Sequence, residues 1–447
     1  MDFLEHLQKN YTKEIVDKMI DSFEQERTHS LVLNTAYYDE NSLFDVNLIK
    51  KHPLVENGYY FENQKLGNDF RFKNGVFYIQ DASAMLPVHF LNVEEHDVIL
   101  DMCAAPGGKT IDAAIKLKNT GMIIANELSY ERAKILSSNV EKLGFCNVFV
   151  TNNNFLDVYS NYENTFDKII LDAPCSGSFM FRKNELSKLD WNYNKVLGCA
   201  KVQHELLDMA GYMVKPGGLI AYSTCSVSPE ENEEIIKVFL ETHEDFEIEK
   251  IEMKDYFYPA KIEGAIYLMP FLFEGEGQFI CVLKKRGISA AKNKEIFENR
   301  CITPLFFKNY ENLFANQVTK NDQIYAYNSY VKTKKLNVLR YGLHVGSLKG
   351  KTEIPSFQLA HFIKNDVVEL DEKNFLKYTK GEEILVSCSD GFKVVSYKNI
   401  NLGFIKVKSG VGKNYYPKGL RNWFSIINIF LDENWHIFFH NFTWFFH

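Results

Sequence analysis

Residues 98–110 read Val98-Ile99-Leu100-Asp101-Met102-Cys103-Ala104-Ala105-Pro106-Gly107-Gly108-Lys109-Thr110. The first four residues are an apolar run that ends in an aspartate, which is typical of a buried strand. The small residues and glycines that follow predict a tight loop, and the sequence from Lys109 to Leu117 predicts a helix. We therefore expect one strand–loop–helix unit, in which the loop backbone and the amides at the helix N-terminus can meet a polar ligand.

Strand and helix patterns alternate from about residue 76 onward. The expected strands are 98–101, 122–127, 148–151, 168–172, 218–225 and 278–283. The expected helices are 109–117, 130–143, 195–214 and one that begins near Ser228-Pro229-Glu230-Glu231. Gly144 after the second helix and Pro229 in the first turn of the last one are boundary signals. This alternation predicts an α/β fold with a doubly wound parallel sheet.

Two cysteines each follow an apolar strand of this sheet. Cys175 ends the run Lys168-Ile169-Ile170-Leu171-Asp172-Ala173-Pro174-Cys175, and Cys225 ends the run Gly218-Leu219-Ile220-Ala221-Tyr222-Ser223-Thr224-Cys225. Ligands bind beyond the carboxyl ends of the strands in such a sheet, so both thiols should open onto one rim beside Asp172. Two thiols and a carboxylate next to a ligand-binding loop suit covalent catalysis on a nucleic-acid base. The residues alone do not rank the two thiols as nucleophile.

The loop after Asp101 lacks two common nucleotide-binding signatures. It has neither the GxxxxGK[ST] spacing of phosphate-binding loops nor the GxGxxG spacing of dinucleotide-binding loops. Glu127 ends the next strand, where an acidic side chain can accept hydrogen bonds from both hydroxyls of a ribose. The loop and Glu127 together predict a site for an adenosyl cofactor, and the alternative is a tight turn without a ligand.

Length and composition limit the class of protein. A chain of 447 residues is too long for one ordinary core, so two or three domains are expected. We find no apolar run long enough to span a membrane, and we expect no signal peptide at the N-terminus. Eight cysteines without a CxxC pair predict neither a disulfide framework nor a metal site, which favours a cytoplasmic protein.

Charge is distributed unevenly along the chain. The formal net charge is −7, but the part from Gly287 to the end has 22 Lys and Arg against 14 Asp and Glu. Residues 1–286 have 29 basic against 44 acidic side chains. A basic C-terminal third is typical of an appended RNA-binding module, and a solvated lysine-rich surface is the alternative interpretation.

Three motifs, in order, resemble those of the RNA (cytosine-5) methyltransferase family of the Sun type. Residues 101–110 are similar to its cofactor motif, Asp172-Ala173-Pro174-Cys175-Ser176-Gly177 to its Pro-Cys motif, and Ser223-Thr224-Cys225-Ser226 to its Thr-Cys motif. Residues 77–87 upstream also match, and the resemblance covers about residues 76–285.

A looser resemblance extends toward the C-terminus. Gly342-Leu343-His344-Val345-Gly346 and Asn414-Tyr415-Tyr416-Pro417-Lys418-Gly419-Leu420-Arg421 are similar to the PUA-like extension of RsmF-type 16S ribosomal RNA methyltransferases. This resemblance implies small-subunit ribosomal RNA as the partner more than transfer RNA. The expected parts are an N-terminal RNA-binding or accessory α+β region (1–75), a Rossmann-like methyltransferase domain (76–286), a linker (287–330), a β-rich PUA-like domain (331–421) and an aromatic-rich tail (422–447).

The resemblance also implies roles for individual residues. The Cys225 thiolate would add to carbon 6 of cytosine, Asp172 would bond ring nitrogen 3, and Cys175 would assist product release. The methyl donor would be S-adenosylmethionine and the product 5-methylcytosine. The residues expected at the cofactor are Cys103, Ala104, Ala105, Pro106, Gly107, Gly108, Lys109, Glu127, Arg132, Asn154 and Asp172. Those expected at the RNA are Arg182, Lys183, Lys418 and Arg421, and we expect no metal, no membrane and a monomeric chain.

One position departs from the family pattern in a way that bears on the cofactor. The family usually has an aspartate near the end of the third strand, whereas this chain has Asn154. An amide can still hydrogen-bond, so we expect altered affinity and not loss. Three alternatives stay open at this point: a transfer RNA cytosine-5 methyltransferase, a DNA methyltransferase with Cys175 as nucleophile, and a non-catalytic RNA-binding ribosome assembly factor.

Overall fold

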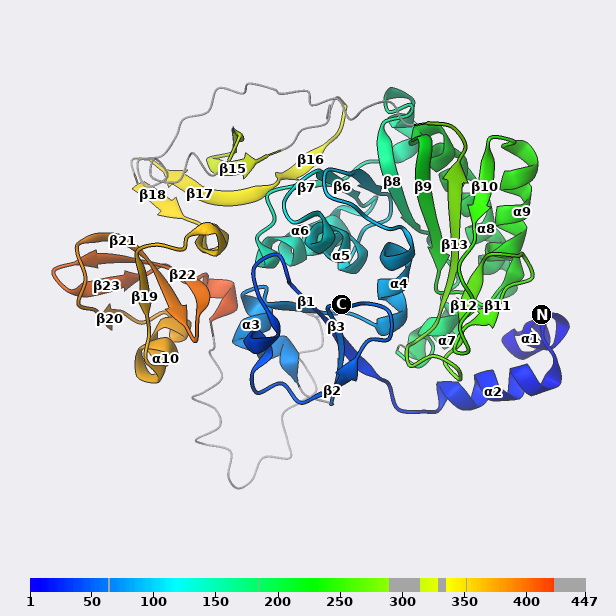
Figure 1. Cartoon of the computed structure of the whole chain (residues 1–447), viewed down its shortest axis with the longest axis horizontal. Helices are drawn as coiled ribbons and strands as arrows, with labels where there is room; N and C mark the ends of the chain where they lie inside the picture. Colours follow the sequence, from blue (N-terminus) through cyan, green and yellow to red (C-terminus); the bar gives the residue numbers. More distant parts are fainter. Residues whose placement is uncertain (63–64, 184, 289–313, 329–334, 351, 422–447) are drawn as a thin grey trace. The chain divides into compact units, whose positions relative to one another are not determined.

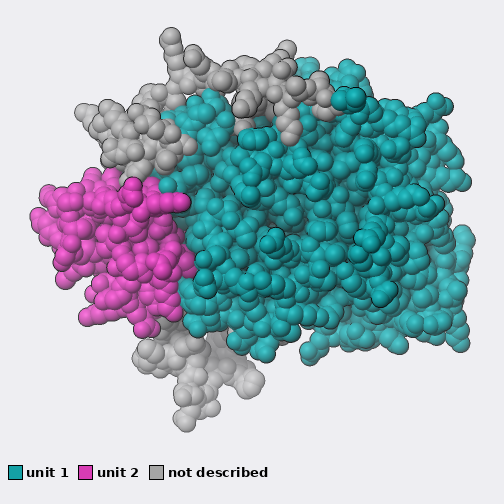
Figure 2. Space-filling model, viewed as in Figure 1, with its two compact units in different colours: residues 1–362 teal, residues 363–447 magenta. Residues whose placement is uncertain are grey.

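The computed structural model describes residues 1–62, 65–183, 185–288, 314–328, 335–350 and 352–421. The chain divides into two compact units, residues 1–362 and residues 363–447 (Figure 2). In the described ranges, no helix combines the length and the apolar character that crossing a membrane requires.

A mixed sheet, ten-stranded within the described residues, forms the centre of the first unit (Figure 1). Its order is β11-β12-β13-β9-β8-β5-β6-β7-β16, and β10 pairs with β13. The strands are β5 (Val98–Asp101), β6 (Met122–Asn126), β7 (Val148–Thr151), β8 (Phe166–Asp172), β9 (Val214–Thr224), β10 (Phe246–Glu249), β11 (Tyr258–Pro259), β12 (Ile266–Leu268), β13 (Gln278–Lys285) and β16 (Val338–Tyr341). β5 to β9 pair in parallel, whereas β13 and β16 run antiparallel to β9 and β7. The predicted α/β fold with a doubly wound parallel sheet is confirmed.

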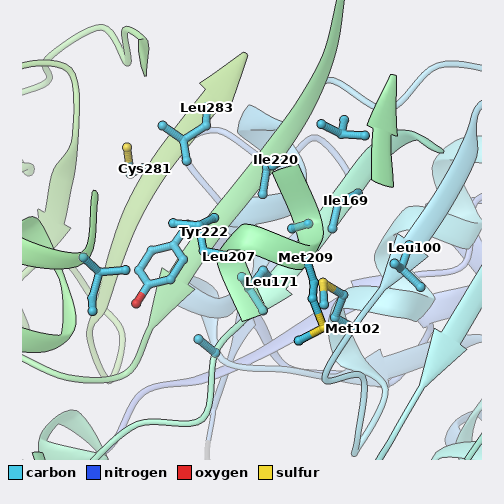
Figure 3. Packing of buried hydrophobic residues seen from close by; sticks show 14 of the residues in the cluster. Leu100, Met102, Ile169, Leu171, Leu207, Met209, Ile220, Tyr222, Cys281 and Leu283 are labelled. Carbon is cyan, nitrogen blue, oxygen red and sulfur yellow. The ribbon is translucent and has the colours of Figure 1, made fainter. Parts of the chain in front are cut away.

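Helices cover both faces of this sheet. They are α4 (Ala82–Phe90), α5 (Gly108–Leu117), α6 (Tyr130–Leu143), α8 (Tyr193–Met213) and α9 (Glu233–Thr242), and the short helix α7 (Glu185–Asp190) lies between β8 and α8 in the chain. Alternate strand residues point to opposite faces, so Ile99 packs with residues of α4 to α6, whereas Leu100 joins the cluster that contains Leu207 of α8 (Figure 3). Burial on both faces explains why these strands appear in the sequence as continuous apolar runs.

Local signals set the helix boundaries near the carboxyl ends of the strands. Ser129 caps α6 by accepting a hydrogen bond from the Arg132 amide, and Gly144 ends the helix at φ +71°. The helix expected from Ser228 is divided into a 3-10 turn, η6 (Pro229–Glu231), and α9. The division occurs at Asn232, whose φ of −124° and ψ of −93° are not helical.

The N-terminal region has two helices and a sheet of its own. Its elements are α1 (Phe3–Asn10), α2 (Lys13–Phe23), β1 (His29–Leu33), β2 (Leu48–Lys51), β3 (Gly58–Phe61), α3 (Phe70–Lys73) and β4 (Phe77–Ile79), with the strand order β2-β3-β1-β4. The Tyr11 hydroxyl donates to the Val227 carbonyl at 2.8 Å, and His6 Nε2 lies 3.1 Å from Ser228 Oγ. This region therefore packs against the loop that follows Cys225.

Part of the expected linker and the start of the expected C-terminal domain belong to the first unit. β14 (Asn316–Lys320), β15 (Gln323–Tyr327), β17 (Leu343–Lys349) and β18 (Thr352–Pro355) form an antiparallel sheet in that order. β16, which lies between β15 and β17 in the chain, pairs with β7 and so extends the central sheet. The first compact unit consequently reaches residue 362. Residues 289–313 of the expected linker lie outside the described residues.

The described part of the second unit is β-rich, as predicted. It contains β19 (Val367–Glu369), α10 (Glu372–Lys380), β20 (Ile384–Leu385), β21 (Gly391–Tyr397), β22 (Ile400–Lys408) and β23 (Val411–Asn414). The strand order is β19-β21-β22-β23-β20. The expected aromatic-rich tail, residues 422–447, lies outside the described residues.

Candidate active site

A cavity of about 410 Å³ lies where β5, β8 and β9 end. Asp101, Asp172 and Cys225, which come from these three strand ends, line it. The rest of its wall is formed by the loop after β5, by residues 28–30 and 78–81 of the N-terminal region, by Met180 and Lys183, and by residues 276–278. The carboxyl rim of the parallel sheet is thus hollowed at the position that the sequence predicts for a ligand.

The loop after β5 brings its backbone to this cavity. Gly107 caps α5 at φ +119°, a conformation that residues with a side chain rarely adopt. A Cβ on Gly108 would lie 3.1 Å from the Gln80 amide group, so a larger residue at this position would have to displace Gln80. Cys103, Ala104, Ala105, Pro106, Gly108 and Lys109 all line the cavity. The loop can therefore offer backbone groups to a ligand at close range.

Asp101 leaves an acceptor free in the wall. The Thr110 hydroxyl donates to Asp101 Oδ2 at 2.6 Å. The other carboxylate oxygen, Oδ1, is buried and has no hydrogen-bond partner in the part of the chain that the structure describes. Burial raises the pKa of Asp101 to about 7. An unsatisfied oxygen in a cavity wall fits a bound molecule with donor groups.

Asp172, in the cavity wall, is held by three donor side chains. Lys109 Nζ donates to its Oδ2 at 2.8 Å, while Ser223 Oγ and Gln278 Nε2 donate to its Oδ1 at 2.7 and 2.9 Å. These three donors come from α5, β9 and β13. They fix the orientation of the carboxylate and place an ammonium group beside it.

The two predicted thiols are in contact. The sulfur atoms of Cys175 and Cys225 are 3.1 Å apart, and both side chains are partly buried. The hydrogen bond with Cys225, together with burial, raises the pKa of Cys175 well above the ordinary value. Cys175 therefore keeps its proton, and the two sulfur atoms lie within hydrogen-bonding distance, with either able to act as donor. Cys225 is the one of the two that lines the cavity.

The residues expected on the ribose and adenine side form a second group. Glu127 is buried, accepts a hydrogen bond from the Ser129 amide at 3.0 Å and pairs with Arg132 at 3.5 Å. Arg132 also donates to the Ala105 carbonyl at 2.8 Å, which links this group to the loop after β5. Asn154 is exposed, and its side chain accepts a hydrogen bond from the Leu156 amide at 3.3 Å. Asn154 thus caps the 3-10 turn η3 (Phe155–Asp157).

The four residues expected at RNA have different surroundings. Arg182 has a nearly buried side chain that pairs with Glu276 at 3.0 Å, so its guanidinium is already engaged. Lys183 is exposed and lines the cavity. In the second unit, Lys418 is exposed, whereas Arg421 donates to the Tyr416 carbonyl. Lys183 and Lys418 are consequently better placed than the two arginines to meet phosphate groups.

Several site residues were not identified from the sequence. Gln278 and Ser223 orient Asp172, and Glu276 holds both Arg182 and Arg27. Glu231 was expected only as part of the first turn of a helix after Cys225, and no role at the site was predicted for it. Gln278 is 106 residues from Asp172 in the chain, and no local pattern signals a contact over that distance.

Three family models match separate parts of the chain. Residues 88–284 match the 16S rRNA methyltransferase RsmB/F, and residues 1–82 match the N-terminal domain of the 16S rRNA methyltransferase RsmF. Residues 365–422 match the methyltransferase RsmF PUA domain, a range that agrees with the second compact unit.

Similar curated proteins are named ribosomal RNA small subunit methyltransferase F. That of Psychromonas ingrahamii is 30% identical over 408 residues, which cover 82% of this chain and 84% of the relative. That of Vibrio campbellii is 35% identical over 254 residues, and this match spans about half of the relative's length, 53%.

Solved structures share the fold of the first unit. A methyltransferase homolog protein from Pyrococcus horikoshii is 28% identical and matches with a TM-score of 0.54, covering 63% of this chain and 98% of that chain. NSun6 from Pyrococcus horikoshii matches with a TM-score of 0.56 at 20% identity, over 64% of this chain and 98% of that chain.

Proposed function

The chain belongs to the family of ribosomal RNA small subunit methyltransferase F, and from this membership we propose that it forms 5-methylcytosine in 16S ribosomal RNA, with S-adenosylmethionine as methyl donor. The observation that carries the proposal is the pair of thiols 3.1 Å apart, of which Cys225 lines the cavity next to Asp172. Methyl transfer to an oxygen or to an exocyclic nitrogen needs no protein nucleophile. A thiol at this place therefore favours a ring carbon as the acceptor.

The residues of the cavity fit an adenosyl cofactor. S-adenosylmethionine, when bound, supplies a methyl group on a positively charged sulfonium. The loop from Cys103 to Lys109 would hold it through backbone groups, and the free Oδ1 of Asp101 supports this because it needs a donor. Glu127, positioned by Ser129 and Arg132, is the proposed acceptor for the ribose hydroxyls. Asn154 would contribute through its amide at the edge of this group.

Cys225 is the proposed nucleophile. Carbon 5 of cytosine is a poor nucleophile until a thiolate adds to carbon 6. The thiolate of Cys225 would form this bond, and the electron pair of the 5,6 double bond would move to carbon 5, which could then accept the methyl group that the sulfonium donor supplies as its sulfur–methyl bond breaks. Cys175 keeps its proton because its pKa is raised, so it can donate a hydrogen bond to the Cys225 thiolate from 3.1 Å.

Asp172 is proposed to contact ring nitrogen 3 of the cytosine. This nitrogen has no proton in the neutral base, so a contact with a carboxylate needs a proton between them. Lys109 Nζ, 2.8 Å from Asp172, is the nearby proton source. Ser223 and Gln278 hold the other carboxylate oxygen, so that Oδ2 is the oxygen shared with Lys109 and the ring.

Release of the product requires the bond to Cys225 to break. Solvent water takes the proton from carbon 5, the electron pair of that carbon–hydrogen bond restores the 5,6 double bond, and the pair of the carbon–sulfur bond returns to Cys225. A thiol in contact with the departing sulfur stabilises it as a thiolate, which is the role that we assign to Cys175. The target base must be unpaired or flipped out to reach this cavity.

Bisulfite sequencing of ribosomal and transfer RNA, from cells with and without the gene, tests the proposal. We expect one or more protected cytosines of 16S ribosomal RNA to become reactive in the deletion strain. Expression of the wild-type chain should restore protection, and a Cys225→Ala variant should not. A loss of protection confined to transfer RNA, or no change in any RNA, would contradict the proposed substrate.

A further inference from the structure

Glu231 is a buried carboxylate that contacts the residue following each active-site cysteine. Ser176, which follows Cys175, donates to it twice: from its amide at 2.6 Å and from its hydroxyl at 2.7 Å. Ser226, which follows Cys225, donates through its hydroxyl to the same oxygen as the Ser176 hydroxyl. We propose that Glu231 is a positioning residue that holds the two thiols at the distance observed between them. The effect that this role would have on catalysis rests on the proposed function.

The contacts make one carboxylate the link between two loops. Cys175 follows β8 and Cys225 follows β9, and the chain separates the two cysteines by 50 residues. The hydroxyls of Ser176 and Ser226 also lie 3.2 Å apart, so that both serines and Glu231 form one closed group. A displacement of either loop therefore breaks at least one hydrogen bond to a charged acceptor.

Glu231 is itself held firmly. It is fully buried, and its carbonyl accepts a hydrogen bond at 2.6 Å from the hydroxyl of Tyr222, a fully buried residue of β9. Its amide donates to the Ser228 carbonyl at 3.0 Å, which closes the turn η6. The backbone that carries the carboxylate is thus anchored to the sheet, and the carboxylate can transmit that position to both loops.

The charge of Glu231 agrees with this role. Burial raises its pKa, and the hydroxyl and amide hydrogen bonds from Ser176 and Ser226 act in the opposite direction. A buried carboxylate needs such donors, and the Ser176 amide and the hydroxyls of Ser176 and Ser226, all from the two cysteine loops, supply three of them. The same negative charge is one of the influences that raise the pKa of Cys175, which keeps Cys175 protonated beside Cys225.

The test compares Glu231→Gln with Glu234→Gln, a control that makes the same change at an exposed position three residues away. The first measurement needs no RNA: phenylarsine oxide condenses with two neighbouring thiols, forming two arsenic–sulfur bonds and one water. We expect the wild type and Glu234→Gln to bind it through Cys175 and Cys225, and a Cys175→Ala variant to lose this binding. Glu231→Gln should bind it about tenfold more weakly, because an amide nitrogen replaces an acceptor of the two hydroxyls.

The second measurement is methyl transfer to small-subunit RNA, with a thermal unfolding scan of each variant. We expect kcat of Glu231→Gln to fall about tenfold or more with little change in KM, and Glu234→Gln to behave as wild type. If Glu231→Gln does not fold, Ser226→Ala takes its place, because it removes one hydroxyl only. We then expect the same decreases in arsenical binding and in kcat, but smaller ones.

The outcomes separate the two proposals. A wild type that binds the arsenical but transfers no methyl group, with a Glu231→Gln variant that binds it weakly, supports the role of Glu231 and contradicts the proposed function. Arsenical binding and kcat of Glu231→Gln equal to those of Glu234→Gln would overturn the role of Glu231.

Discussion

Burial sets the charge of single side chains around the candidate site. Asp112 of α5 is the simplest case, because it is fully buried and both of its carboxylate oxygens lack hydrogen-bond partners among the described residues. Burial raises its pKa to about 6, against which the charges of Lys116 and Lys109 act only weakly. The ionised form of Asp112 is thus costly in the folded state, although the residue lies on the helix that follows the loop after β5.

Asp112→Asn is expected to stabilise the protein at neutral pH. The pKa of Asp112 is about 6 in the folded state and about 3.9 in the unfolded state, so the folded state binds the proton more tightly. The contribution of Asp112 to the free energy of unfolding therefore falls as pH rises from about 4 to 6 and is constant above pH 6. Asparagine has the shape of the protonated acid but cannot ionise. Chemical unfolding should therefore show a gain of about 1–2 kcal/mol at pH 8 and none at pH 4.

The control is Asp17→Asn at an exposed position of α2. It should leave stability nearly unchanged at both pH values. An equal effect of Asp112→Asn at pH 4 and pH 8 would mean that Asp112 does not titrate in this range.

At the scale of elements, β16 joins the later part of the first unit to the central sheet. It pairs with β7, and its nearly buried Arg340 lies 3.5 Å from Glu141 of α6. His344 of β17 lies 3.6 Å from the same carboxylate. Burial opposes the charge of Glu141, but Arg340 and His344 outweigh it and lower the pKa of Glu141 to about 2. Glu141 is thus the electrostatic link between α6 and two strands.

Glu141→Gln is expected to destabilise the first unit by about 1–2 kcal/mol at pH 7, since it leaves Arg340 buried without its carboxylate; the partial exposure of Glu141 keeps the value moderate. Because the pKa of Glu141 is lowered on folding, its ionised carboxylate stabilises the folded state at pH values above about 4.3, the pKa in the unfolded state. This stabilisation is lost as pH falls toward 2. The difference between the urea unfolding curves of variant and wild type should therefore shrink as pH falls from about 4 toward 2. Glu131→Gln, which breaks an exposed pair with Lys134, is the control with little effect at any pH.

The sequence predicts those elements whose boundaries carry local signals. The helix 130–143 agrees with α6 because Ser129 and Gly144 mark its ends. The N-terminal region was predicted as α+β, but its individual strands and β14 to β18 were not located, because they are short and their pairing depends on neighbours that are distant in the chain. At the site, loop motifs located Cys175, Cys225 and Asp172, whereas Gln278 and Glu231 acquire their contacts only through tertiary packing.

For the whole molecule, the positive charge of the C-terminal third is divided between the two compact units. Residues 287–362, assigned to the first unit, have 11 Lys and Arg against 5 Asp and Glu, whereas residues 363–447 have 11 against 9. The excess thus lies mainly ahead of the part that matches the PUA domain. The proposed contact with RNA phosphates therefore extends to the segment that precedes the second unit.

The central claim is that Cys225 forms the covalent bond to the cytosine and that Cys175 helps to break it. Denaturing gel electrophoresis of Cys175→Ala and Cys225→Ala, each incubated with small-subunit RNA and S-adenosylmethionine, tests this claim most directly. We predict a retarded protein–RNA complex with Cys175→Ala, linked through Cys225, and neither complex nor methyl transfer with Cys225→Ala. A stable complex formed by Cys225→Ala would contradict the claim and assign the attack to Cys175.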